Sequence, residues 1–239
     1  MLGKRLINTT VAGAAPSCTT DTVQILDGSP FQSIATYQLD GNADDLTGNY
    51  DGTASNVTYA TGKFGQAAVF NGSSSGISLG ALNQFSNTTV SFSLWFNSTS
   101  VSTTAILLGS NQNAIFAGEF DLYTYNSGFL VTVATSTSSY IQLTTPANLS
   151  NNTWHNVVVT HDGSSVVFYF DGQQNTTGTG TISNETSGVM IGANISSGSN
   201  TASSQYFIGK MAVAQIYNRA LTATEVLQNY NVTRHRFGV

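Results

Sequence analysis

The sequence predicts an all-β protein, a jelly-roll sandwich of two antiparallel sheets. Short apolar runs are separated by turn signals containing Gly, Asn or Asp about every 8–12 residues, a spacing typical of sandwiches and jelly rolls. Residues 90–97 carry apolar side chains at the even positions and mostly polar ones at the odd positions, as a strand with one buried face does. Glu and Lys, which helical bundles need in quantity, occur only three times each.

The clearest local prediction is a β-hairpin formed by residues 154–161 and 166–170. β-Branched and aromatic residues dominate both runs, and Asp162-Gly163 lies between them. An Asp-Gly pair favours a tight turn because glycine reaches positive φ without steric cost. Further strands are expected near residues 67–70, 77–79, 105–108, 120–125, 129–134, 140–143, 189–191 and 206–217.

One short helix is predicted near the carboxyl end of the sequence, after Thr222. Thr222 and Glu225 have the spacing of a capping box, in which each side chain bonds the backbone amide of the other residue. Val226, Leu227 and Tyr230 give this helix an apolar face. All other regular structure is expected to be β.

The charge content excludes several classes of partner. The chain has 7 basic and 12 acidic residues and a net charge of −5, whereas nucleic-acid binding needs many cationic side chains against the phosphates. No run of about 18 apolar residues is present, so no membrane insertion is expected. Cys18 is the only cysteine, which leaves it without a partner for an intrachain disulfide.

Residues 1–33 are predicted to form an extended arm before a domain at 34–239. The arm lacks the rhythm of strand and turn, and its apolar run at 11–15 is too short for the core of a signal peptide. It combines apolar anchors with positive charge, so we expect it to attach the chain to a larger assembly or to neighbouring copies. The expected anchor residues are Leu2, Lys4, Arg5, Leu6 and Ile7.

Four ordered motifs between about residues 34 and 231 carry a resemblance to a known family. They are residues 37–53 around Asp40-Gly41-Asn42, residues 62–72, the hairpin from Trp154-His155 to Asp171-Gly172, and residues 216–226. In this order they resemble laminin-G-like domains of the concanavalin A-like type, which implies a two-sheet antiparallel jelly roll. Such domains occur in adhesion proteins, in sugar-binding modules appended to enzymes and in bacteriophage virion proteins, so the fold leaves the function open.

The acidic loop at 40–51 is a candidate calcium site, because Ca²⁺ prefers about six to eight oxygen ligands in a flexible geometry. The resemblance also implies a structural calcium near this segment. However, Ala212 and Val213 stand where relatives often carry a completing carboxylate. The alternative is a turn-forming loop of Asp and Asn residues that holds no metal. The candidate ligands are Asp40, Asn42, Asp45 and Asp51.

One predicted strand carries carboxylates, and several carry aromatic rings that bear on function. Glu119 and Asp121 lie on one side of a strand, as the carboxylates of jelly-roll glycosidases do, but Tyr123 stands near where a second Glu is needed. We therefore expect no enzymatic activity.

Aromatic rings offer faces for sugars, although the same rings often pack inside a domain. The candidate glycan-binding residues are Trp95, Tyr123 and Tyr125. His155 and His161 are expected to be structural, since no third metal ligand lies nearby in the sequence.

These observations together predict a non-enzymatic adhesion or decoration protein. We expect the arm to attach it to a virion, such as a phage particle, in homo-oligomeric form, with the jelly roll displayed towards a cell-surface glycan. A virion protein reaches the extracellular space by host lysis and needs no export signal. The alternatives are a stand-alone carbohydrate-binding lectin and, less favoured, a glycoside hydrolase.

Overall fold

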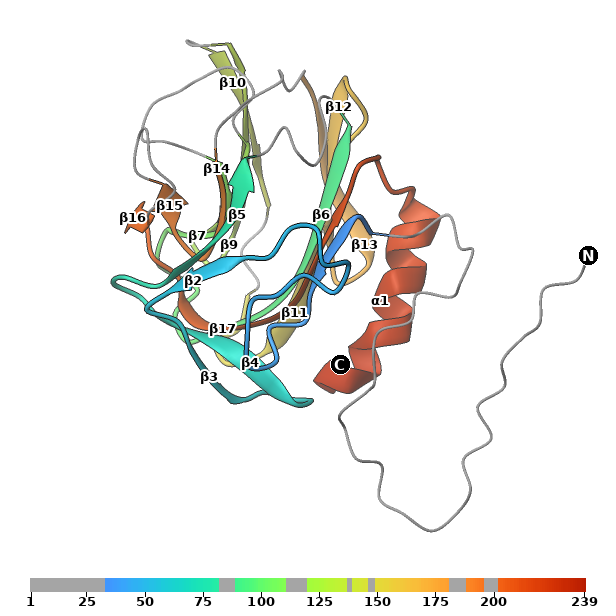
Figure 1. The fold of residues 1–239 in the computed structure, drawn as a ribbon. Helices are drawn as coiled ribbons and strands as arrows, with labels where there is room; N and C mark the ends of the chain where they lie inside the picture. Colours follow the sequence, from blue (N-terminus) through green and yellow to red (C-terminus); the bar gives the residue numbers. More distant parts are fainter. Residues whose placement is uncertain are drawn as a thin grey trace, which may run out of the picture.

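Two antiparallel sheets face one another, and a helix lies against the outer face of one of them (Figure 1). The computed structural model describes residues 33–81, 89–110, 120–136, 139–145, 149–180, 188–195 and 202–239. The predicted arm therefore lies almost wholly outside the described residues. The predicted all-β jelly-roll sandwich is confirmed, with both sheets antiparallel throughout the described pairings.

The larger sheet has eight strands and includes the predicted hairpin. Its order is β13 (Gln173–Thr179), β12 (Ser165–Phe170), β11 (Trp154–His161), β6 (Val90–Ser98), β17 (Ile208–Tyr217), β4 (Gln66–Asn71) and β3 (Thr58–Thr61), with β1 (Ala35–Tyr37) also paired to β17. In the turn between β11 and β12, the Asp162 side chain accepts hydrogen bonds from the backbone N–H groups of Ser164 and Ser165, and Gly163 has φ +100°. The Asp-Gly prediction is thus confirmed.

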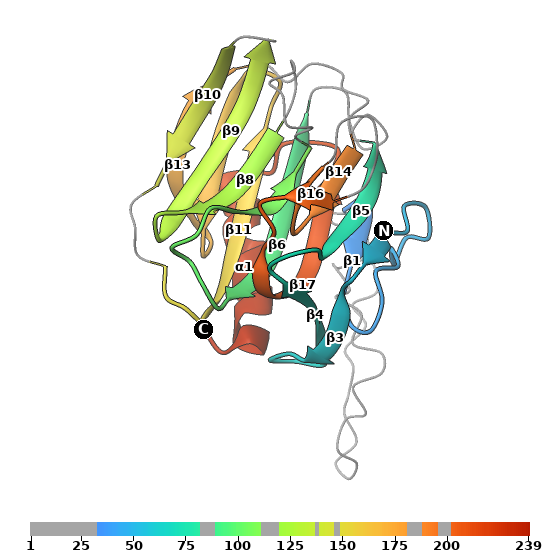
Figure 2. The same cartoon turned by 90° about the vertical axis from the view of Figure 1, so that its left-hand side faces the viewer.

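The smaller sheet has seven strands and lies opposite, as the turned view shows (Figure 2). Its order is β10 (Ser139–Thr144), β9 (Gly128–Ser136), β8 (Phe120–Tyr125), β7 (Ala105–Gly109), β14 (Gly188–Ile191), β5 (Gly76–Ala81) and β2 (Thr53–Ser55). A two-stranded ribbon of β15 (Asn194–Ile195) and β16 (Ala202–Ser204) accompanies it.

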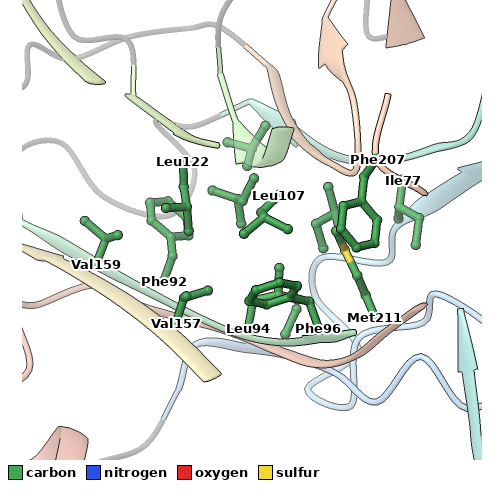
Figure 3. Close-up of a cluster of buried hydrophobic side chains, with 14 of the residues drawn as sticks. Ile77, Phe92, Leu94, Phe96, Leu107, Leu122, Val157, Val159, Phe207 and Met211 are labelled. Atoms are coloured by element: carbon green, nitrogen blue, oxygen red, sulfur yellow. The ribbon is translucent and has the colours of Figure 1, made fainter. Parts of the chain in front are cut away.

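The hydrophobic core lies between the two sheets and follows the alternation in the sequence. Phe92, Leu94 and Phe96 of β6 point inward and are at most 4% exposed. From the other sheet, Leu107 and Leu122 meet them across the gap (Figure 3). Because successive side chains of a strand point to opposite faces, the residues between these core positions face outward.

Helix α1 (Ala223–Phe237) forms at the predicted place and is longer than the predicted apolar face. Both halves of the capping box are present, with the Glu225 N–H donating to Thr222 Oγ1 and the Thr222 N–H to Glu225 Oε2. Gly238 ends the helix in the left-handed region at φ +75°. Leu227 is 38% exposed, so it does not share the buried face of Val226. Among the described residues no helix is both long and apolar enough to cross a membrane.

Candidate functional site

An open polar groove lies at the β2–β5 edge of the seven-stranded sheet. It has a volume of about 350 Å³, and a loop that precedes β2 forms one of its walls. Thr53 of β2 pairs with Ser78 of β5, so the outward side chains of both strands form the floor. The residues that line the groove are Asn49, Tyr50, Asp51, Thr53, Ser55, Ser78, Leu79 and Gly80.

The loop wall is held in place by a buried carboxylate, that of Asp45. Its oxygens accept hydrogen bonds from the backbone N–H groups of Thr36 at 2.8 Å, Thr47 at 3.1 Å, Asn49 at 3.3 Å and Tyr50 at 3.2 Å, and from the Thr47 hydroxyl. Burial by itself raises the pKa of this carboxyl, but the hydrogen bonds from Thr47, Thr36 and Asn49 outweigh burial and lower it. Asp45 is therefore an ionised structural group that shapes the backbone leading into the groove.

Two further contacts connect the groove wall to the core. The buried Tyr37 hydroxyl donates to the carbonyl oxygen of Tyr50 at 2.6 Å, and the Asp45 N–H donates to Asp51 Oδ1 at 2.9 Å. Burial, with the nearby carboxylates of Asp45 and Asp51, raises the pKa of Tyr37, so its hydroxyl stays protonated as a donor. One oxygen of Asp51 is thus used by the loop, while the side chain remains exposed at the groove.

A family model described as the concanavalin A-like lectin/glucanases superfamily matches residues 70–227. The chain belongs to this superfamily. The matched segment runs from the end of β4 into α1 and includes the central hairpin, so it contains most of the concanavalin A-like sandwich. A comparison with curated proteins finds none that matches significantly.

Several solved structures share this concanavalin A-like fold. Domain 4 of AbnA, a GH43 extracellular arabinanase from Geobacillus stearothermophilus solved with arabinotriose, is 24% identical with a TM-score of 0.69, covering 82% of this chain and 97% of that one. The binding domain of Paraclostridial Mosquitocidal Protein 1 is 15% identical (TM-score 0.63, 79% of this chain and 49% of that one). The botulinum neurotoxin serotype D binding domain is 14% identical (TM-score 0.65, 85% and 51%). This chain thus spans about half the length of the two toxin binding domains, and these likenesses show the fold.

The predicted calcium ligands of this concanavalin A-like domain are only partly brought together. Asp45 and Asp51 lie next to each other and share a hydrogen bond. Asp40 instead accepts from the Gln66 N–H at 2.7 Å, and the Asn42 side-chain amide donates to the carboxylate of Asp44 at 2.6 Å. Within the described ranges, no three His, Cys, Asp or Glu side chains form a group able to hold a metal ion. Because Asp45 accepts from protein N–H groups, the contacts fit the alternative of an Asx-rich turn better than an oxygen cage for calcium. Calcium binding stays a prediction.

Trp95, a predicted sugar-contact residue, lies beneath helix α1. It faces outward from β6, as the alternation indicates, but is only 2% exposed. Its ring stacks on Phe237 at a centroid distance of 4.0 Å and on Tyr230 at 5.7 Å. The indole therefore joins the helix to the sheet, and this structure leaves it no free ring face for a sugar. The contacts thus show that Trp95 packs inside the domain, which was the alternative to a sugar contact.

The other two predicted aromatic residues lie on β8, on the outer face of the seven-stranded sheet. Tyr123 is 7% exposed and donates from its hydroxyl to Asp121 Oδ2 at 2.9 Å, whereas Tyr125 is 38% exposed. Asp121 itself is 2% exposed. Tyr125 thus offers the more accessible ring, although neither tyrosine lines the groove. Glu119 lies outside the described residues.

Both predicted structural histidines face the interior of the sandwich. His161 is 1% exposed, and its ring nitrogens contact the Gly180 carbonyl at 2.8 Å and the Gly163 N–H at 3.1 Å. His155 Nδ1 lies 2.9 Å from Asp171 Oδ2, while Phe96 and Phe170 pack against its ring. These contacts are of the structural kind expected.

Sequence reasoning missed most of the residues that line the groove. Asn49, Thr53, Ser55 and Ser78 belong to the large population of polar turn and strand residues, and nothing in their local sequence distinguishes them. One signal was available: Ser78 lies between Ile77 and Leu79, two apolar residues that alternation assigns to the core. The outward direction of Ser78 was therefore predictable, but its neighbours across the sheet were not.

Proposed function

We propose that this domain is a non-enzymatic carbohydrate-binding module that holds a neutral oligosaccharide in the groove between β2, β5 and the loop before β2. The observation that carries the proposal is the lining of the groove. It combines the Asp51 carboxylate, the Asn49 amide, several hydroxyls and the half-buried Tyr50 in one open hollow. Its volume of about 350 Å³ falls at the small end of the range for ligand pockets.

The chemistry of this lining complements sugar hydroxyls, which both donate and accept hydrogen bonds. A carboxylate accepts from two hydroxyls, an amide donates and accepts, and Ser and Thr do either. No lining residue is cationic, so the groove favours neutral over acidic sugars. The complex of AbnA domain 4 with arabinotriose supports a short oligosaccharide as the first ligand to test.

The same lining argues against hydrolysis. Glycosidases generally use two carboxyl groups, one of which must carry a proton at the working pH. Asp51 is the one carboxylate among the lining residues, and the neighbouring Asp45 has a lowered pKa with its oxygens occupied by N–H donors. A site with this composition can bind a sugar, but it has no carboxyl group to protonate the leaving oxygen.

Titration calorimetry with arabinotriose, followed by an array of neutral oligosaccharides, tests this proposal. Asp51→Asn keeps an acceptor for the Asp45 N–H but loses the charge, and we expect it to weaken sugar binding about tenfold or more. Asp162→Asn removes the same charge from an exposed hairpin turn and should bind as the wild type does. Equal affinities of the two variants, or no binding to any neutral sugar, would contradict the proposal.

Display on a larger assembly remains part of the proposal for residues 1–33. The likeness to toxin binding domains supports a recognition module carried by a bigger protein or particle. We expect Leu6→Asp with Ile7→Asp in the full chain to abolish attachment to a phage particle or to other copies while leaving sugar binding intact. Sedimentation velocity, together with electron microscopy of native particles, would detect the attachment, and a monomer bound to no particle would contradict it.

A further inference from the structure

Cationic side chains without an ion pair gather in one region of this acidic protein. The described residues hold five of the seven basic residues, and Arg219 pairs with Glu225 at 2.9 Å. The other four form no ion pair within the described ranges. They are Lys63, Lys210, Arg234 and Arg236.

Three of these cations lie in or beside the turn that connects β3 to β4, next to the last turn of α1 (Figures 1 and 2). Lys210 Nζ donates to the Thr61 carbonyl oxygen at 2.6 Å. The Arg236 guanidinium carbon lies 4.3 Å from the centroid of the Phe64 ring. Lys63 lies so close to the helix end that a Cβ placed on Gly238 would be 2.6 Å from its Cε. We call Lys63, Phe64, Lys210 and Arg236 the basic end.

The helix dipole does not account for this clustering. A helix carboxyl end carries roughly half a negative charge, which a single nearby cation satisfies. Lys63 and Lys210 come from other elements and add two further full charges. The carboxylate of Asp40 lies under the same turn, but it accepts from the Gln66 N–H at 2.7 Å and forms no ion pair there. Three cations beside one carboxylate leave an excess of positive charge, which favours an external anion.

We propose that the basic end is a second binding site, for a polyanionic glycan that carries carboxylate or sulfate groups. Phe64 is 38% exposed beside the cations, so it adds a ring face against which a sugar can pack. The site belongs to the β3–β4 edge of the eight-stranded sheet, whereas the groove belongs to the seven-stranded sheet. A concanavalin A-like domain with both sites would hold a neutral and an acidic segment of glycan independently.

The probes are dextran sulfate and polygalacturonate, with uncharged dextran and duplex DNA as comparisons, measured by titration at 50 and 200 mM NaCl. Three cationic contacts predict that affinity for the bound polyanion falls about twenty- to fortyfold between these salt concentrations. Binding to either acidic glycan supports the site and tells sulfate from carboxylate. Binding to neither, or tighter binding to DNA than to both, would overturn it.

Matched variants separate a local site from an effect of net charge. Lys63→Gln and Gln228→Glu each lower the net charge by one, but Lys63 is at the basic end and Gln228 lies on the exposed face of α1. We expect Lys63→Gln to weaken polyanion binding about fivefold or more, and Gln228→Glu to leave it nearly unchanged. Equal losses in the two variants would overturn the proposal. Because Lys63 is exposed, its replacement leaves the fold intact, which a thermal melt would verify.

Each of the two proposed sites can be disproved without disproving the other. Asp51→Asn should weaken the neutral sugar alone, and Lys63→Gln the polyanion alone. Addition of Lys210→Gln and Arg236→Gln to Lys63→Gln should reduce polyanion binding about a hundredfold. Loss of both ligands through either single variant would mean one shared site and would contradict this second one.

Discussion

The outer faces of the two sheets begin from the same sequence pattern and end in different environments. On the eight-stranded sheet, helix α1 covers outward residues such as Trp95, which stacks on two helix rings and is 2% exposed. On the seven-stranded sheet, the outward residues of β2 and β5 line an open groove beside the exposed Asp51. The same alternation therefore produces an internal helix–sheet contact on one face and a candidate sugar site on the other.

This difference shows that alternation fixes the direction of a side chain, while a separate element decides its exposure. Trp95 and Ser78 both lie between inward-facing neighbours. Two rings of α1 stack on Trp95, whereas no residue of α1 lines the groove at Ser78. The proposed binding function thus depends on which face of the sandwich the helix leaves uncovered.

The largest expected effect is on the covered face. Trp95→Ala removes the ring that joins α1 to β6, and we expect the free energy of unfolding to fall by about 3–5 kcal/mol. Urea unfolding followed by circular dichroism would measure it. If this variant does not fold, Trp95→Phe provides a milder change that should still cost about 1–2 kcal/mol. A loss below about 1 kcal/mol for Trp95→Ala would mean that the helix does not cover this face.

The loop beside the groove should be nearly as sensitive, at Asp45. Asp45→Asn replaces an acceptor of four backbone N–H groups, and we expect a loss of about 2–3 kcal/mol in the free energy of unfolding at pH 7. The folded-state pKa of Asp45 is lowered, so its contribution is complete above the unfolded value near 4 and is lost as the pH falls through the folded value.

Denaturant unfolding from pH 7 to pH 2 would test the direction of this pH dependence. The wild type should lose stability below about pH 4, and the difference between wild type and Asp45→Asn should shrink in the same range. A difference that grows on acidification would contradict the assignment of Asp45 as an ionised structural group.

A smaller effect is expected where the helix begins. Thr222→Ala removes one half of the capping box and should cost about 1 kcal/mol, measured as a lower melting temperature. Because α1 covers only the eight-stranded sheet, this change should leave sugar affinity unaltered in the folded protein. A weakened affinity would mean that the two faces are coupled.

The smallest effect is expected on the open face at Tyr125. This residue is 38% exposed, and Tyr125→Ala should change the free energy of unfolding by no more than about 0.5 kcal/mol. The contrast with Trp95→Ala sharpens the comparison between the faces, since both residues are outward-facing aromatics. Similar losses for the two variants would remove the distinction.

The sequence predicted the fold well because the fold depends on local signals. The alternation at 90–97, the Asp162-Gly163 turn and the Thr222–Glu225 capping box all formed as expected. The groove was missed because its parts are distant in sequence: Asn49 lies in a loop, while Thr53 and Ser78 meet only through strand pairing. The sequence left the role of Trp95 open for a related reason, since its cover comes from Tyr230 and Phe237, more than a hundred residues later.

The most direct test of the central claim is an NMR titration that maps the bound neutral oligosaccharide onto the backbone amides. If the uncovered face holds the sugar, the largest chemical-shift changes will be at Asn49, Asp51, Thr53 and Ser78, and the amides around Trp95 will remain unaffected. Changes concentrated along β6 and α1, with the groove amides silent, would contradict the claim.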